Sequence, residues 1–169
     1  MMLRPLLALL AGTAGSFVAL SACSAQVPSA DAPEAESAPG WQDAPLAAGT
    51  WVYRQDDRGS VALFGEPESE AVFLVRCALA ERRIYFSREG TLEGGGTMTI
   101  STTHGAKSYP AQGGTGALPY AVAAAEARDD FLDKMAFTRG RIAVSVNGMP
   151  LVAIPNWPEM IRVFEDCRA

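Results

Sequence analysis

The sequence is poor in several residue types on which common functions depend. It contains one His, which excludes a metal site built from several histidines. Its 14 Lys and Arg are outnumbered by 19 Asp and Glu, so the basic face that nucleic-acid binding needs is not expected. Its three Cys cannot all pair within one chain, so one of them must have another role. A length of 169 residues suits one domain with appendages.

The first 22 residues have the pattern of a secretory signal peptide. A single charge, Arg4, precedes an apolar stretch that continues to Leu20. Gly12 and Gly15 interrupt this stretch, whereas a transmembrane helix would need about 20 unbroken apolar residues. We therefore expect residues 1–22 to direct export.

The stretch ends at residues 20–23, Leu-Ser-Ala-Cys, which resemble the bacterial lipobox. In that motif the Cys becomes the first mature residue and carries lipid, and several buried acyl chains make a durable anchor. The resemblance implies that Cys23 is lipidated. Because Ser24 rather than Asp follows, it also implies the outer membrane, facing the periplasm. The alternative is an ordinary signal peptide that is cleaved a few residues after an incidental Cys.

Residues 23–48 are predicted to be a lipid-anchored, disordered tether. They are rich in Ala, Ser and Pro and contain four acidic and no basic residues. Apart from Trp41 they offer almost nothing to bury, and such segments do not fold on their own. The tether would hold the rest of the chain away from the membrane.

Residues 49–169 are predicted to form a single β-rich globular domain. They carry 13 basic and 15 acidic side chains, so their charge indicates no particular partner. Short alternating segments predict a mainly β (α+β) fold. We expect an antiparallel β-sandwich or small barrel with a short helix and a packed C-terminal helix.

About eight strands are expected in this domain. The clearest lie at 49–54, 60–64, 71–78, 83–88, 97–102, 141–146 and 149–154. Residues 71–78 are apolar on both faces, as in a central strand. Residues 112–116 are Gly-rich and predicted to be a flexible loop. Residues 119–128 are ambiguous, because Ala favours a helix but sheet pairing can override that preference; a strand to about Ala125 is favoured.

Two helices follow. Asp129 or Asp130 is expected to cap a short helix that buries Phe131, Leu132 and Met135. For the last helix, Asn156 is the expected N-cap and Glu159 completes a capping box.

With Cys23 assigned to lipid, Cys77 and Cys167 remain for an oxidising compartment. Cys77 lies in a predicted core strand and Cys167 in the closing helix, so a disulfide would fasten the helix to the sheet. The alternative is a redox-active pair, which usually needs close spacing such as Cys-x-x-Cys. The sequence favours the structural disulfide.

The order of these elements resembles that of known envelope proteins. The resemblance depends on four segments: Phe73-Leu74-Val75-Arg76-Cys77 with its hairpin, the helix with Phe131-Leu132, the strand at 140–146, and the helix that ends at Cys167. Over residues 70–168 this pattern is similar to invasion-associated locus B-type proteins and to an accessory lipoprotein of type VI secretion clusters. Residues 137–168 also resemble uncharacterised alphaproteobacterial lipoproteins. The resemblance implies a β-sandwich without a catalytic motif and assigns no functional residue.

Chemically active candidates are few. His104 is expected in a turn between strands, where it could serve as a general base only with a nucleophile and an orienting acid nearby. Asp129, Asp130 and Asp133 lack the spacing of a calcium loop and are better explained as helix-capping residues.

Four arginines near the C-terminus, Arg139, Arg141, Arg162 and Arg168, could form a basic ligand patch if the last helix packs beside the 141–146 strand. The more ordinary alternative is that they pair with Glu159, Glu165 and Asp166 at helical spacing.

These features together predict a non-enzymatic envelope lipoprotein that acts as a binding or structural module, with no cofactor and no metal. One alternative is a periplasmic inhibitor or chaperone-like protein that pairs with a partner through an edge strand. The other is a hydrolase that uses His104.

Overall fold

The computed structural model describes residues 35–169. The predicted signal peptide, Cys23 and the first part of the predicted tether lie outside the described residues. Nine strands are present: β1 (Thr50–Asp56), β2 (Gly59–Gly65), β3 (Phe73–Ala78), β4 (Arg83–Glu89), β5 (Gly95–Thr102), β6 (Gly105–Gly113), β7 (Tyr120–Glu126), β8 (Arg141–Val146) and β9 (Val152–Pro155). The two helices are α1 (Phe131–Ala136) and α2 (Pro158–Arg168).

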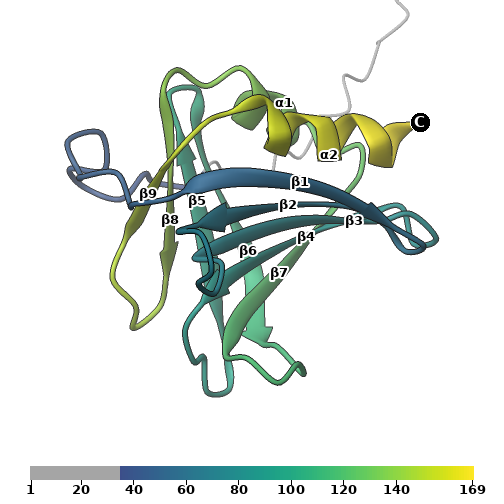
Figure 1. Ribbon diagram of the computed structural model, residues 1–169. Helices are drawn as coiled ribbons and strands as arrows, with labels where there is room; N and C mark the ends of the chain where they lie inside the picture. The colour runs from purple at the N-terminus through teal and green to yellow at the C-terminus, as the bar shows by residue number, and fades with distance from the viewer. Residues whose placement is uncertain (1–34) are drawn as a thin grey trace, which may run out of the picture. The chain divides into compact units, whose positions relative to one another are not determined.

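All nine strands belong to one antiparallel sheet with the order β1-β2-β3-β4-β7-β6-β5-β8-β9. Figure 1 shows β1 to β4 side by side, with β5, β8 and β9 running steeply across their direction. The sheet therefore curls into a half-barrel. This confirms the predicted mainly β fold with a short helix and a C-terminal helix.

The concave side of the sheet holds the core. Aromatic rings follow one another across it, with 5.4–6.5 Å between the centroids of contacting rings, in the order Phe64, Trp51, Phe73, Phe86, Tyr109 and Phe131. Alanines occupy the inner positions of β7, where Ala121, Ala123 and Ala125 are all buried. These small residues leave space inside the curl for large side chains from other strands.

Helix α2 covers β1, β2 and β3 from the concave side. It buries Met160, Val163, Phe164 and Cys167 against them, as its alternation of apolar and charged residues predicts. Because α2 packs against the first strands of the sheet, it does not lie beside β8, which was the condition for the predicted arginine patch.

The strand prediction for residues 119–125 is confirmed by β7, and the burial of Phe131, Leu132 and Met135 in α1 is confirmed too. Strand β6 was not predicted. Its sequence includes Pro110 and ends in the Gly-rich stretch, both of which discourage a strand assignment. Pairing of residues 105–112 with β5, and of 111–113 with β7, overrides these local signals.

The predicted cap of α2 is wrong. Trp157 is the N-cap residue, it makes no side-chain capping bond, and Pro158 begins the helix. Asn156 instead donates its side-chain amide to the carbonyl oxygens of Ala136 and Thr138, at 3.1 and 3.0 Å. An N-cap Asn would accept a helix N–H with its side-chain oxygen, whereas Asn156 uses its side-chain NH2 as a donor and stands one residue before the N-cap.

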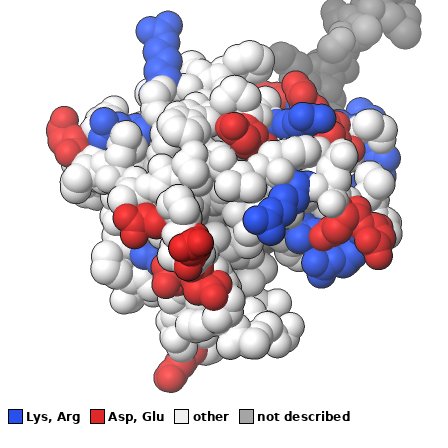
Figure 2. Space-filling model, viewed as in Figure 1, with Lys and Arg blue, Asp and Glu red and all other residues white. Residues whose placement is uncertain are grey.

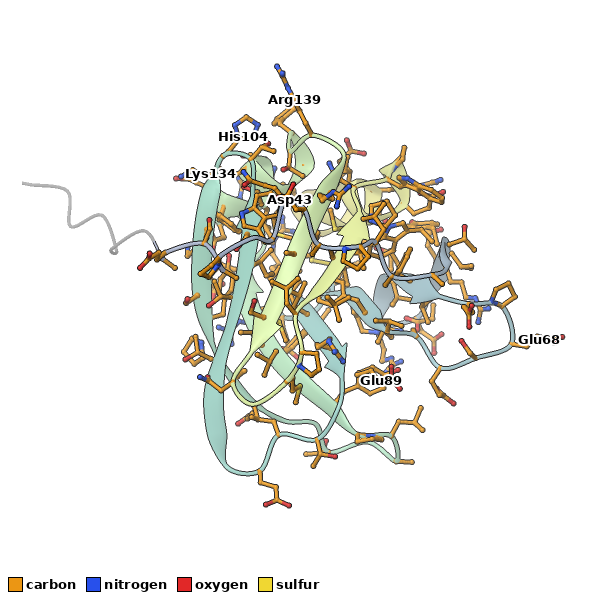
Figure 3. All side chains as sticks on the ribbon, turned by 90° about the vertical axis from the view of Figure 1, so that its left-hand side faces the viewer. Asp43, Glu68, Glu89, His104, Lys134 and Arg139 are labelled. Carbon is orange, nitrogen blue, oxygen red and sulfur yellow. A yellow bond between two sulfur atoms is a disulfide. The ribbon has the colours of Figure 1, made fainter. Side chains whose placement is uncertain are left out.

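The C-terminal part of the predicted tether also differs from the prediction, because residues 35–48 pack against the domain. Trp41 is buried, and the backbone N–H of Ala47 donates to the carbonyl of Ala153 on β9. The backbone N–H of Ala35 bonds in the same way to Ala106 on β6. In Figure 3 this segment passes in front of the strands near Asp43. One large apolar side chain and a few backbone bonds suffice to hold it.

Candidate functional site

The predicted disulfide is present. Cys77 on β3 and Cys167 on α2 are bonded, with their Cα atoms 5.4 Å apart and both residues fully buried. The bond joins the closing helix to the sheet across 90 residues of sequence. Its position in the core suits a structural staple, since reactive disulfides need access to solvent.

Polar contacts also hold the C-terminal half of α2. Tyr53 on β1 donates its hydroxyl proton to Asp166 over 2.5 Å, and the guanidinium of Arg162 lies 4.5 Å from the centroid of the Tyr53 ring. Arg82 donates to the carbonyl oxygens of Arg168 and Ala169. Burial, followed by the hydrogen bond to Asp166, raises the pKa of Tyr53 above its usual value.

The four arginines of the predicted ligand patch do not lie together in the structure. Arg141 donates to the carbonyl of Ala44, Arg162 lies over Tyr53, and Arg168 pairs with Asp133 at 2.6 Å. Arg139 is exposed at the loop between α1 and β8. Among the ion pairs of the described residues, none joins these arginines to Glu159, Glu165 or Asp166. The packing of α2 against β1 to β3 explains why these arginines form neither a common patch nor the predicted pairs along the helix.

His104 lies in the turn between β5 and β6, as predicted, and is exposed. Its Nε2 is 3.0 Å from the carbonyl oxygen of Phe137, and its backbone N–H donates to Thr102. The ring thus engages a backbone carbonyl. The hydrogen bonds of the described residues give it no carboxylate or hydroxyl partner that would orient it as a general base.

Asp129 is the hub of a small polar cluster between β6 and α1. It accepts two hydrogen bonds from Lys107 Nζ at 2.9 and 2.8 Å, one from the Tyr109 hydroxyl, and one from the backbone N–H of Phe131. Burial and the charge of Asp129 raise the pKa of Tyr109 far above its usual value. Of the two acids predicted to cap α1, Asp130 is the N-cap residue and makes no side-chain capping bond, whereas Asp129, one residue earlier, accepts from the backbone N–H of Phe131. Within residues 35–169, no group of three or more His, Cys, Asp or Glu could hold a metal.

The outer face of the first three strands carries an apolar row that the sequence analysis missed. Strand register aligns Val52, Leu63 and Leu74 across β1, β2 and β3. Val52 is exposed, and the other two are half-buried. With Leu118 from the loop after β6 they line a cavity of about 480 Å³, a size typical of binding sites. We call this cavity the outer groove.

The loop between β2 and β3 forms an acidic rim on the outer groove. Glu66, Glu68 and Glu70 all line it, and none of them joins an ion pair found in the described part of the chain. Figure 2 shows acidic side chains gathered over this loop, beside an uncharged area. Arg54 of β1 also lines the groove.

A second cavity continues the outer groove across the sheet. It shares Leu74, Leu118 and Tyr120 with the first and extends to Arg76, which pairs with Asp56 at 2.9 Å. Burial, then the charges of Glu70 and Glu89, raise the pKa of Tyr120. The signal for this face was present in the sequence, since residues 71–78 are apolar on both sides. We interpreted this pattern as a central strand buried on both faces. In the structure, the outward face of that strand is part of the floor of the outer groove.

One alternative was that a partner adds a strand to an edge of the sheet, so the two edge strands, β1 and β9, are relevant to it. The edge of β9 is occupied in part by residues 46 and 47 of the same chain. The edge strand β1 carries Arg54 and Asp56, and charged side chains of this kind discourage further pairing.

Neither described helix is long and apolar enough to cross a membrane. The chain matches no protein-family model, no curated protein and no solved structure.

Proposed function

We propose that this protein is a non-enzymatic lipoprotein of the bacterial envelope, anchored through Cys23 to the periplasmic face of the outer membrane. Its domain acts as a binding module, and its outer groove receives a peptide segment that has apolar side chains next to a Lys or Arg. The single observation that carries the binding role is the apolar floor of the outer groove with its acidic rim.

Two properties of the groove support this kind of partner. Its floor exposes Val52 beside the half-buried Leu63 and Leu74, and a ligand would remove this apolar surface from water. The three rim glutamates have no cation against them in the ion pairs of the described residues. A basic residue in the partner would supply that cation, and like charges would disfavour an acidic segment.

The anchor rests on residues outside the described part of the chain. Its support is the Leu-Ser-Ala-Cys motif directly after an export signal. The buried Cys77–Cys167 disulfide fits an exported protein, because such bonds persist in oxidising compartments.

The anchor is tested by fractionation of cells that produce the full chain or its Cys23→Ala variant. The full chain should sediment with membranes, and mass spectrometry should find acyl chains on Cys23. The variant should appear in the soluble periplasmic fraction. A wild-type protein that is itself found in that fraction, without lipid, would contradict the anchor.

The groove is tested with three ten-residue peptides in which Leu alternates with Lys, Gln or Glu. The Lys peptide should bind about tenfold more tightly than the Glu peptide at low salt, because three weak charge contacts add to the apolar contact. High salt should reduce this difference. The triple variant E66Q/E68Q/E70Q should lose the preference.

The matched control E81Q/E93Q/E126Q changes three glutamates that do not line the outer groove and should retain the preference. Equal binding of the three peptides to the wild-type protein would refute the groove assignment.

A further inference from the structure

Two aromatic side chains are exposed at one end of the domain. Phe137, at the end of α1, is 76% exposed and Trp157, at the start of α2, is 41% exposed. Asn156 connects them, because it precedes Trp157 and its amide binds the carbonyl groups on both sides of Phe137. We call the surface formed by Phe137, Trp157, Arg139 and His104 the aromatic end.

The backbone around these residues is well fixed. Thr138 is buried, its hydroxyl accepts from the backbone N–H of Thr103 at 2.8 Å, and the N–H of Arg139 donates to the Thr103 hydroxyl. The N–H of Asn156 also donates to the carbonyl of Gly140. The exposure of Phe137 is thus imposed by a hydrogen-bonded framework and does not reflect a loop that could fold the ring inward.

Basic side chains accompany the aromatic rings. Figure 3 shows Arg139 projecting from this end, with His104 and Lys134 close to it and Asp43 below them. The described ion pairs include no acid against the guanidinium of Arg139. Exposed aromatic rings with neighbouring cations are typical of surfaces that rest in the headgroup layer of a membrane.

The chain also reaches the domain at this end. The backbone bond from Ala35 to Ala106 lies two residues beyond His104. Eleven residues separate Cys23 from Ala35, and such a segment spans at most about 40 Å when fully extended. A lipid on Cys23 would therefore keep this part of the domain near the bilayer.

From this arrangement we infer that the aromatic end rests on the phospholipid surface, with Phe137 and Trp157 in the headgroup layer and Arg139 facing lipid phosphates. The inference rests on the proposed lipid anchor. It leaves the outer groove free, because none of the residues of the aromatic end lines that groove. The domain would then be oriented on the membrane, with its binding face exposed.

The three Trp residues of the chain allow a selective test. Trp41 and Trp51 are 4% exposed, so a quencher in the bilayer should report on Trp157. The lipidated full chain is reconstituted into vesicles of phosphatidylethanolamine and phosphatidylglycerol, with and without brominated acyl chains. Brominated lipid should remove most of the Trp157 emission and should protect Trp157 from acrylamide in the water.

Three variants define the result. Trp157→Phe should abolish the lipid-dependent quenching, and Phe137→Ser should reduce it by about half or more, because the remaining contact is weaker. Leu79→Ser changes another exposed apolar side chain and should leave the quenching unchanged. Emission that is unaffected by brominated lipid in a protein shown by mass to be lipidated would overturn the inference while the anchor stands.

If mass spectrometry finds no lipid on Cys23, the anchor fails, and flotation of the unlipidated full chain with the same vesicles decides the inference. Flotation that is lost in Phe137→Ser and retained in Leu79→Ser would support it. A wild-type chain that does not float would overturn it, and the aromatic end would then be assigned to a protein partner.

Discussion

The indole N–H of Trp51 on β1 donates a hydrogen bond of 2.8 Å to the carbonyl oxygen of Pro155 on β9. These two strands are the opposite ends of the sheet order, so one side chain connects both edges of the curled sheet. The same ring contacts Phe64 and Phe73 in the core. Closure of the half-barrel is therefore coupled to core packing.

Replacement of Trp51 by Phe should lower the free energy of unfolding by about 2–3 kcal/mol. The change removes ring volume and leaves the Pro155 carbonyl without its donor in a buried place. Chemical denaturation would measure the loss. The exposed Trp157→Phe is the matched control and should change stability by less than about 0.5 kcal/mol; equal effects of the two variants would contradict the assigned role of Trp51.

The Cys77–Cys167 bond closes a long loop, so its removal should cost more than a local contact. The double variant Cys77→Ala/Cys167→Ala should lose about 4–5 kcal/mol in the chain-entropy model. Denaturation of the oxidised protein with and without reductant gives an independent value. In the Cys23→Ala variant the stability of the domain should be unchanged, and an equal loss there would show that the effect does not come from the loop closure.

The sequence predicted the disulfide and most strands because these depend on local patterns and on the small number of cysteines. It did not predict β6, because pairing with β5 stabilises a segment whose Pro110 and glycines argue against a strand. It misplaced Asn156 as a helix cap, since α2 begins one residue later than expected and the Asn156 amide donates to carbonyl groups of Ala136 and Thr138, about 20 residues away. Local patterns do not reveal such distant partners.

The candidate sites were harder to predict for the same reason. The outer groove arises from the register that aligns Val52, Leu63 and Leu74, and each of them alone is an ordinary strand residue. The exposure of Phe137 depends on a framework formed with Thr103 and Asn156. The arginine patch required α2 beside β8, and the concave face of β1 to β3 binds it instead.

Asp129 and Asp130 offer a matched pair at the start of α1. Asp129→Ala should cost about 2 kcal/mol or more, because Lys107, Tyr109 and the N–H of Phe131 all lose their acceptor. Asp130→Ala should cost less than about 0.5 kcal/mol, since that side chain makes no capping bond. Thermal or chemical denaturation would distinguish them, and a larger loss at Asp130 would reverse the assignment.

Tyr109 should make the protein sensitive to alkali. Its pKa is raised in the folded state by burial and by Asp129, so the unfolded chain loses this proton first, near pH 10. The stabilisation is fully present below that pH and falls as the pH rises further, because the unfolded state then binds fewer protons. Unfolding free energies measured from pH 8 to 11 should fall less steeply in Tyr109→Phe than in the wild type. The half-buried Tyr85→Phe should keep more of the slope. Identical slopes in the wild type and in Tyr109→Phe would show that Tyr109 is not the cause of the alkaline destabilisation.

Trp41 tests whether residues 35–48 belong to the folded domain. Although this segment has the composition of a tether, Trp41 is 4% exposed and the chain beside it bonds to β6 and β9. Trp41→Ala should therefore lower the free energy of unfolding by about 3 kcal/mol, as loss of a buried aromatic ring does elsewhere. The exposed neighbour Gln42 provides the control, because Gln42→Ala should have almost no effect. Limited proteolysis should cut the Trp41→Ala protein between residues 35 and 48 well before the wild type. Equal cleavage rates and unchanged stability would show that this segment is part of the tether and not of the folded domain.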